Sequence, residues 1–268
     1  IKSTDTDKTG SLIHSTSGVN ATVELFLTGG SSPNLWHYVS PPVSGAIPSV
    51  FSGTLNILGF IEPDVVTNVF DGWTWFDGAT ANGVSGPSFS TLDVGKGYDI
   101  YYPTNQTRSF TGSLNAVNQN INLSYTNSDP LLGGYNLIGN PYPCNIDWSV
   151  IINDVGFDSN ISKAIHFTRA DVQVSWVNGV GNPGDVTSFI PPMQGFFVKT
   201  AANATINITS SAKTHTTHAR YKSETIIPLV RLRLEDDNGK DETVVRFDNN
   251  ATSSFDNNFD ALKIMPKG

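Results

Sequence analysis

An internal repeat limits the fold of this chain more than any other feature. The segment 35–43, around Trp36, is matched by 134–142, and the segment 92–101 is matched by 190–199. The equivalent residues Trp36 and Tyr135 stand 99 positions apart, in the same chain order as the other matches. Such spacing indicates a tandem duplication of a unit of about 100 residues, the usual size of a β-sandwich domain.

Most of the remaining sequence consists of short segments in which polar and apolar residues alternate, as they do in β-strands. Polar and apolar residues alternate over 22–27, 120–125, 205–209, 229–234 and 243–247, and turn residues separate these runs, which is typical of antiparallel β structure. The sequence around Asn238 and Gly239 predicts a hairpin turn between the last two runs. Helical periodicity is nearly absent; one helical turn is expected over 147–153, with Asp147 near its N-cap.

The expected fold is therefore all-β, with two tandem, related antiparallel β-sandwich (jelly-roll-like) units and a C-terminal β-hairpin extension. The expected boundaries are 1–14 for an upstream linker or the end of a preceding module, 15–115 for the first unit and 116–210 for the second, with 211–268 forming a connector and closing strands. The first part of the connector, 210–223, is polar and is expected to be exposed.

Composition excludes several function classes. The formal net charge is −8 and only 15% of residues are charged, so the clustered Lys and Arg that bind nucleic acid are missing. No apolar run is long enough for a transmembrane helix. The single cysteine, Cys144, excludes an intrachain disulfide and is expected to be a buried thiol. Since the chain starts at Ile1 and lacks a signal-peptide pattern, we expect a processed form or a fragment of a longer protein.

Several segments resemble large secreted proteins of Bacteroidetes. They are Gly-Ser-Leu-Ile at 10–13, Trp-His-Tyr-Val-Ser-Pro-Pro from Trp36, Gly-Lys-Gly-Tyr at 95–98, the segments 134–148 and 190–199, and the tail 241–264. The resemblance implies a β-rich module that precedes the C-terminal sorting domain of a type IX secretion cargo. It implies an extracellular or outer-membrane location and no catalytic residue. Because the chain ends at Gly268 without a recognisable sorting domain, we expect that domain to have been removed on export or to lie outside this sequence.

Catalytic motifs are missing from the sequence. There is no nucleophile elbow, no zinc helix and no phosphate loop, and Gly95-Lys96-Gly97 is interpreted as a turn that enters a strand. His215 and His218 lack neighbouring ligands and are expected in a solvated loop, whereas His37 and His166 are expected within strands. A pair of carboxylates for glycoside hydrolysis would have to converge in a cleft, which no spacing here indicates.

Acidic clusters in two loops suggest calcium. Asp236 and Asp237 lie at the predicted hairpin turn, and Asp256 and Asp260 lie in a later loop. Hard oxygen ligands on loops suit Ca²⁺, although the spacing does not match an EF-hand. Solvated acidic turns remain the alternative interpretation.

Aromatic residues carry the carbohydrate-binding hypothesis. Trp73 and Trp75 are two positions apart and would point to the same face of a strand. Trp75 matches Trp176 and Trp73 matches Val174, so both can instead be core residues. Tyr101 matches Lys199, which predicts a solvent-facing position for Tyr101.

The resulting expectation is a non-catalytic extracellular module that acts as an adhesin, stalk or spacer in a larger secreted bacterial protein. Its partner would be a polysaccharide or a protein on a host or cell surface. The first alternative is a carbohydrate-binding module of a secreted polysaccharide-degrading enzyme. The second is a hydrolase whose carboxylate site the sequence does not reveal.

Overall fold

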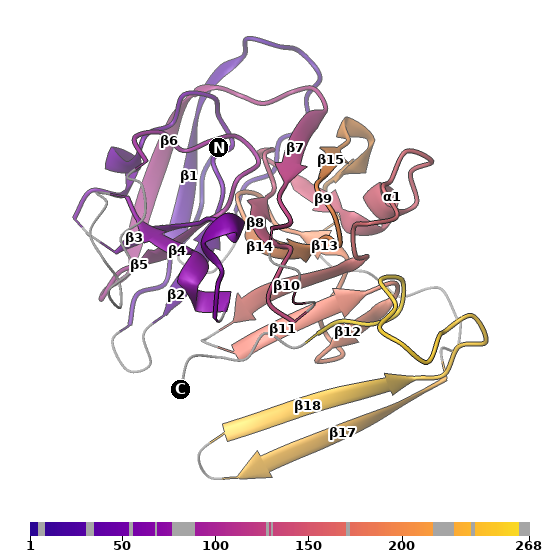
Figure 1. Ribbon diagram of the computed structural model, residues 1–268. Coiled ribbons are helices and arrows are strands. Elements are labelled where there is room, and N and C mark those ends of the chain that lie inside the picture. The colour runs from indigo at the N-terminus through magenta and orange to yellow at the C-terminus, as the bar shows by residue number, and fades with distance from the viewer. Residues whose placement is uncertain are drawn as a thin grey trace.

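The structure is a computed structural model and consists mainly of antiparallel β-strands (Figure 1). It describes residues 1–4, 9–30, 35–53, 56–67, 69–76, 89–126, 129, 131–169, 172–216, 228–236 and 239–262. Among these, one five-residue α-helix and four short 3₁₀ helices are the helical elements. The β-rich, nearly helix-free fold class predicted from the alternating pattern is thus confirmed.

The strands of the first half are β1 (Asn20–Leu27), β2 (Trp36–Val39), β3 (Ile57–Phe60), β4 (Trp73–Trp75), β5 (Tyr98–Tyr101) and β6 (Gln106–Ser113). Those that follow are β7 (Gln119–Leu123), β8 (Tyr135–Gly139), β9 (Asn145–Asp147), β10 (Ala164–Arg169), β11 (Val172–Val177), β12 (Val180–Asn182), β13 (Phe189–Ile190), β14 (Gly195–Lys199), β15 (Ala204–Ile208), β16 (Lys213–Thr214), β17 (Leu229–Asp236) and β18 (Gly239–Arg246). The helices are η1 (Pro48–Phe51), η2 (Glu62–Asp64), η3 (Val69–Gly72), α1 (Trp148–Ile152) and η4 (Ser210–Ala212).

Two larger sheets organise the fold. The first has the strand order β2-β5-β3-β4, and the second has the order β12-β11-β10-β14-β8. β1 pairs with β6, and β7 pairs with β15, in two further two-stranded sheets. A three-stranded sheet, β13-β9-β16, and the hairpin β17-β18 complete the described strands.

Strands that match in the sequence repeat occupy matching places in the two larger sheets. β2 pairs with β5 so that Trp36 stands opposite Tyr101. β8 pairs with β14 so that Tyr135 stands opposite Lys199. These are equivalent residues of the repeat, and the register of the two pairs is therefore the same. In each sheet the next strands are β3 and β4, or β10 and β11. The repeated tryptophans lie on β4 and β11, and the second sheet has one more strand, β12, beyond β11.

Apolar side chains form a core in each half. One cluster contains Phe51, Tyr98 and Phe110, and the other contains Trp148, Trp176 and Phe196, all of them buried. The alternation of strands such as β7, whose exposed and buried residues take turns, follows from a sheet that covers a core with one face only. A third, smaller cluster lies between the two larger sheets and is described below.

Local predictions from sequence hold at three places. α1 starts after Asp147, whose carboxylate accepts a hydrogen bond from the Ser149 amide at 2.9 Å, as expected for an N-cap. Cys144 is fully buried, and burial raises the pKa of its thiol to about 11. The predicted hairpin is present as β17 and β18.

The predicted exposure of the connector at 210–223 holds for Ser210, Ser211, His215 and Thr216 but is wrong for Ala212. Ser210–Ala212 form η4, and Ala212 is buried in the second core. Lys213–Thr214 form β16, which pairs with β9. Pairing of β16 with β9 holds this segment against the second core, where the apolar side chain of Ala212 is buried. His218 lies outside the described residues.

The N-terminal stretch that we expected as a linker is bonded to both halves of the fold. The Ile1 amino group donates to the Thr22 carbonyl at 2.7 Å, alongside β1. The Leu12 amide donates to the Pro143 carbonyl of the second half at 2.8 Å. None of the helices among the described residues is long and apolar enough to cross a membrane.

Candidate functional site

The two larger sheets meet at a joint formed by main-chain hydrogen bonds. The Ser40 amide donates to the Met193 carbonyl at 2.8 Å, and the Gly139 amide donates to the Gly95 carbonyl at 2.9 Å. In the sequence repeat, Ser40 is equivalent to Gly139, and Gly95 is equivalent to Met193. Each half therefore gives the other the same hydrogen bond in return.

Two β-bridges at the joint follow the same reciprocal rule. Val39 bridges to Gln194, and Ile138 bridges to Lys96. Val39 is equivalent to Ile138, and Lys96 is equivalent to Gln194. In contacts of this kind, a residue of the first half meets a residue of the second half, and the equivalents of these two residues meet each other as well. Such reciprocal contacts define an isologous interface with two-fold character.

Glycines let the two main chains approach closely at the joint. A Cβ on Gly97 would lie 2.6 Å from Cγ of Leu137, and a Cβ on Gly195 would lie 2.9 Å from the Tyr38 carbonyl carbon. Gly97 and Gly195 are equivalent residues of the repeat. Both halves thus keep glycine where the opposite strand passes, as close main-chain approach requires.

The buried carboxylate of Glu62 forms a second connection between the two halves, beside the joint. Glu62, in η2 of the first half, has an exposed fraction of 3%. Its Oε1 accepts hydrogen bonds from the amides of Thr126 at 3.0 Å and Gly134 at 2.8 Å. Its Oε2 accepts a bond from the Thr126 hydroxyl at 2.9 Å. Three charge-assisted bonds to the second half satisfy a charge that would otherwise be costly to bury.

Lys199 lies on the second half close to this carboxylate. Its Nζ donates to the Gly133 carbonyl and sits 4.1 Å from the centre of the Tyr135 ring. Burial lowers the pKa of Lys199 to about 8, and the nearby charges of Glu62 and Asp129 act in the opposite direction. The lysine and the carboxylate together form a buried polar cluster beside the joint.

His166, in β10, belongs to the same buried region. Its ring lies 6.3 Å from that of Tyr135, centre to centre. Burial, with a smaller effect of the Lys199 charge, lowers the pKa of His166 to about 4. The side chain is therefore neutral at pH 7, and it sits in its predicted strand.

The histidine gives the fold an acid sensitivity. Between pH 6.5 and pH 4 the unfolded chain binds a proton at His166 and the folded chain does not. Lowering the pH across this range should therefore reduce the free energy of unfolding by about 3 kcal/mol. Urea titrations across this range should show the fall, and His166→Gln should flatten it. An equally steep profile in His166→Gln would contradict this assignment.

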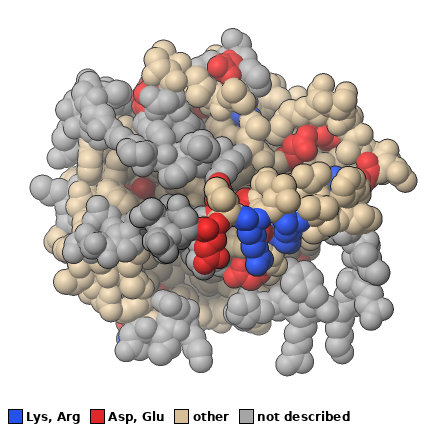
Figure 2. Space-filling view, turned by 90° about the horizontal axis from the view of Figure 1, so that it is seen from below, with Lys and Arg blue, Asp and Glu red and all other residues tan. Residues whose placement is uncertain are grey.

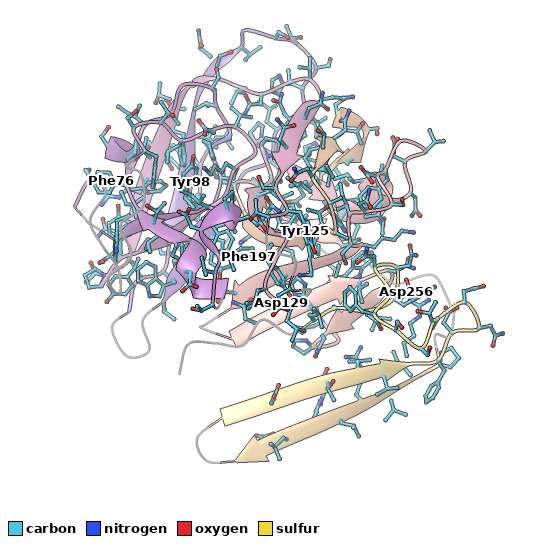
Figure 3. The ribbon with its side chains drawn as sticks, viewed as in Figure 1. Phe76, Tyr98, Tyr125, Asp129, Phe197 and Asp256 are labelled. Atoms are coloured by element: carbon cyan, nitrogen blue, oxygen red, sulfur yellow. The ribbon has the colours of Figure 1, made fainter. Side chains whose placement is uncertain are left out.

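An aromatic cluster fills the space between the facing sheets. Phe197 of β14, labelled in Figure 3, contacts the rings of Phe60, Tyr38 and Trp73 at centre-to-centre distances of 4.9, 5.5 and 5.9 Å, edge to face. Trp73 therefore packs between the halves. Although Trp73 is partly exposed, its ring contacts are with Tyr38, Phe60 and Phe197 of this cluster.

Beyond this cluster, the same face of the first sheet carries a row of partly exposed aromatic rings. Trp36 and Tyr101 stand opposite one another, with ring centres 5.3 Å apart and planes inclined by 36°. Trp75 lies on the same face, because it stands opposite Leu58 and Leu58 stands opposite Asp99, two residues from Tyr101. Trp36, Tyr101 and Trp75 are called the aromatic row below.

The equivalence of Trp75 and Trp176 does not extend to their surroundings. Trp176 is buried in the second core, whereas Trp75 is partly exposed on the opposite face. In the second sheet, Phe197 stands opposite His166, whereas Trp176 stands opposite the preceding residue, Ile165. In the first sheet, Asp99 is the equivalent of Phe197, and Leu58 stands opposite both Asp99 and Trp75. The register of the two sheets thus differs by one residue at this point, and Trp75 and Trp176 therefore lie on opposite faces of their sheets.

The reason for expecting Tyr101 at the surface was wrong. Lys199, its equivalent, has an exposed fraction of only 8%, because it bonds to a carbonyl and lies over an aromatic ring. Tyr101 is half-buried against Trp36. The structure does bring Tyr101 and Trp75 onto one face, with Trp36, which the sequence interpretation did not include.

The acidic residues considered for calcium lie at opposite ends of the hairpin. Asp236 ends β17 at the turn, and Asp237 lies outside the described residues. Asp256 and Asp260 follow β18, and one Asp260 oxygen accepts the Asp256 amide at 2.7 Å, which makes a capped turn. Within the described ranges, no three or more His, Cys, Asp or Glu side chains come together as a metal site.

Comparison with protein-family models, curated proteins and solved structures found no match for this chain.

Proposed function

We propose that the chain is a non-catalytic structural module, a stalk or adhesive spacer of a larger secreted or outer-surface bacterial protein. We further propose that it is built from two tandem, related antiparallel β-sandwich units with a C-terminal hairpin. The matching strand order of the two sheets and the equal register of β2-β5 and β8-β14 support the duplication.

The observation that carries the proposal is the reciprocal joint. Tandem modules joined by a flexible linker change their angle freely, and their contacts are small. Here Ser40 and Gly139 exchange main-chain hydrogen bonds with the opposite half, and the Glu62 carboxylate adds three more. Main-chain bonds in a buried joint resist rotation, and a spacer needs such a fixed angle to hold a neighbouring domain at a set distance.

Distances between spin labels on the two halves test this proposal. Thr107 on β6 and Thr205 on β15 are exposed and suit labelling through cysteine. The native Cys144 is buried with a raised pKa and should stay unlabelled. We expect a single narrow distance distribution by electron spin resonance. A broad or bimodal distribution would mean that the halves move and would remove the basis for a rigid spacer.

The aromatic row favours carbohydrate binding as a second candidate function. Flat rings of Trp and Tyr that combine an apolar face with a polar edge are suited to sites at an open surface. The row lies on the sheet face beyond the Phe197 cluster, and its members Trp36, Tyr101 and Trp75 are all partly exposed. No other described feature points to sugar binding.

A glycan array tests this second function. Binding that Trp75→Ala and Tyr101→Ala each weaken at least tenfold would assign the module to carbohydrate recognition. The control Phe247→Ala removes an aromatic side chain, 58% exposed, after the hairpin and should have no effect. If the array stays silent with wild-type protein, in the presence and absence of calcium, the second function fails and the spacer proposal is unaffected.

A further inference from the structure

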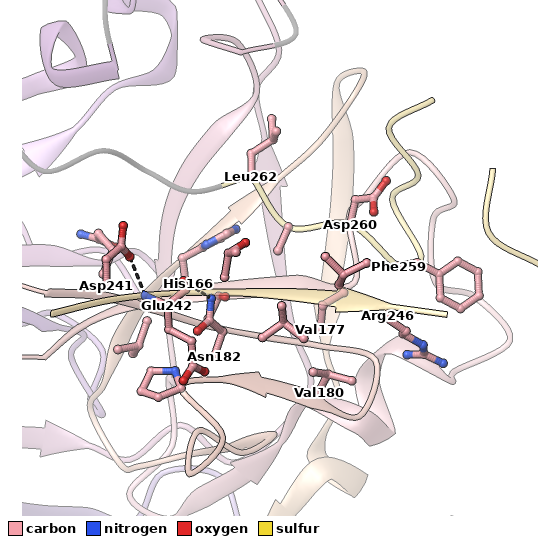
Figure 4. A pocket seen from close by; sticks show the side chains of 18 of the residues that line it. His166, Val177, Val180, Asn182, Asp241, Glu242, Arg246, Phe259, Asp260 and Leu262 are labelled. Carbon is pink, nitrogen blue, oxygen red and sulfur yellow. Dashed lines mark hydrogen bonds between the residues drawn. The ribbon is translucent and has the colours of Figure 1, made fainter. Parts of the chain in front are cut away.

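The C-terminal hairpin of β17 and β18 lies beside the second sheet and is attached to it by few bonds. Figure 1 shows the hairpin below that sheet, with β18 nearer to it and β17 farther away. The Asn182 side chain donates to the Glu242 carbonyl at 3.2 Å (Figure 4), and Arg246 donates to the Asn178 carbonyl at 2.8 Å. Among the described strands, β17 and β18 pair only with each other. A two-stranded hairpin is marginally stable unless a third strand or a packed apolar face supports it.

One face of the hairpin, called the inner face, is polar and is directed at the second sheet. The side chains of Glu242 and Arg246 alternate along β18, and only 10% and 16% of them are exposed. Residues directly opposite each other on two strands share a face, and Arg233 of β17 stands opposite Glu242. Glu242 accepts hydrogen bonds from Arg233 and, at 2.7 Å, from Arg231. The side of the hairpin nearest the fold is therefore rich in charges.

The opposite, outer face of the hairpin is apolar and exposed. Val230 stands opposite Val245, and the alternation of β-strands puts Leu232, Leu234 and Phe247 on the same side. The exposed fractions are 44% for Val230, 56% for Leu232, 75% for Leu234, 46% for Val245 and 58% for Phe247. These five residues are called the hairpin patch below. A hairpin that belonged to the second core would turn its apolar side inward, so the hairpin patch faces away from the core of its own chain.

No other strand of the described chain exposes large apolar side chains in this way. The remaining exposed ones, such as Val66, Val155 and Phe255, lie outside the strands. The aromatic row is on a sheet, but its members are only partly exposed. The hairpin patch is comparable with the largest apolar patch of an ordinary monomer, roughly 300 to 600 Å², and such patches are often interaction sites.

A second copy of the chain offers the face that the hairpin patch requires. Sheets pack face to face, about 10 Å apart, when both faces are apolar, and the described strands expose one such face, the hairpin patch itself. We propose that the chain forms a two-fold dimer in which the hairpin patches of two copies pack against each other. Two-fold dimers of this self-complementary kind are the commonest oligomers. The contact would bury roughly 600 to 1,200 Å² in total, twice the area of one patch, which suits a reversible dimer.

Charges near the hairpin do not oppose this contact. The chain has a net charge of −8, and a large charge of one sign tends to keep proteins monomeric. Figure 2, which views the molecule from below, where Figure 1 places the hairpin, shows acidic and basic side chains next to each other without a broad area of one sign. The hairpin patch has no charged member, and Asp241, opposite Leu234, lies towards the turn. Burial of apolar groups therefore dominates the contact.

Sedimentation velocity over a range of protein concentrations tests this inference. We expect a transition from monomer to dimer with a dissociation constant of about 1 to 100 μM. The double variant Leu232→Thr with Leu234→Thr removes apolar surface and keeps residues that suit a strand, so it should raise this constant about tenfold or more. Thr243→Val adds an apolar group opposite Leu232 and should lower the constant about threefold.

The matched control is Val155→Thr, which makes a similar change at an exposed apolar residue outside the hairpin and should dimerise like wild type. Thermal unfolding of each diluted variant verifies that it folds. A chain that stays monomeric well above this concentration range, a dimer that the double variant leaves unchanged, or an assembly larger than a dimer would each overturn the inference. So would a dimer that dissociates in about 1 M sodium chloride, because that response marks a contact between charges. The joint lies within one chain, and its spin-label distances can be measured below the dissociation constant, so this inference and the spacer proposal fail separately.

Discussion

Gly139→Ala should lower the free energy of unfolding by about 3 kcal/mol or more, at the upper end of the range for overpacked sites. A Cβ at this position would lie 2.3 Å from Cβ of Ser40, and Ser40 is fully buried in the opposite half. The clash can be relieved only by moving strands apart, and that movement stretches the bonds of Ser40 and Gly139 across the joint. Urea unfolding followed by circular dichroism measures the loss.

Gly156→Ala is the matched control for this substitution. Its Cβ would have as nearest neighbour the Asp154 side-chain oxygen at 3.3 Å, in an exposed turn. This variant should stay within about 0.5 kcal/mol of wild type. If Gly139→Ala were as stable as Gly156→Ala, the two halves would not be in close main-chain contact at the joint.

Glu62→Ala should cost about 3 to 5 kcal/mol, as expected when one member of a buried charge network is removed. The substitution leaves the amides of Thr126 and Gly134 without their acceptor and removes the negative charge that favours protonated Lys199. The measurement is again the free energy of unfolding from urea titration.

Two further variants separate the causes of this loss. Glu62→Gln keeps an acceptor oxygen and the shape of the side chain and removes the charge, so it should cost about 1 to 3 kcal/mol. Glu24→Ala removes a surface ion pair with Lys2, whose side chain is 83% exposed, and should cost much less than Glu62→Ala. Equal effects of Glu62→Ala and Glu24→Ala would rule out a structural role of Glu62 at the joint.

The strands, the hairpin and the repeat could be predicted from the sequence because they depend on local signals. Alternation of apolar residues fixes which side of a strand faces the core, and Asp147 caps α1 through its own neighbours. The structure pairs β2 with β5 and β8 with β14 in the same register, which agrees with the repeat, although the sequence alone did not predict these pairings.

The joint could not be predicted, because it depends on contacts between segments about 100 residues apart. The described hydrogen bonds of the Glu62 carboxylate all go to the second half, so its role becomes visible only when Thr126 and Gly134 are placed beside it. The sequence interpretation gave Gly97 only a place in a strand-entry turn, although its repetition at Gly195 carries a further signal. A glycine kept at the same place in both halves, beside an apolar strand, indicates close approach as well as a turn.

The candidate aromatic site was only partly predictable. Trp73 and Trp75 were expected on one face, and that expectation follows from strand geometry alone. The burial of Trp176 and the partial exposure of Trp75 depend on a register difference of one residue between the two sheets, which sequence similarity does not show. Tyr101 was identified for a reason that fails, since its equivalent Lys199 is buried.

The most direct test of the account follows the unfolding of each half separately. With 5-fluorotryptophan in place of tryptophan, ¹⁹F resonances from Trp36, Trp73 and Trp75 report on the first half, and those from Trp148 and Trp176 report on the second. A rigid structural module held by the reciprocal joint predicts that all five native resonances disappear at the same urea concentration. Two separate midpoints, one for each half, would contradict that claim.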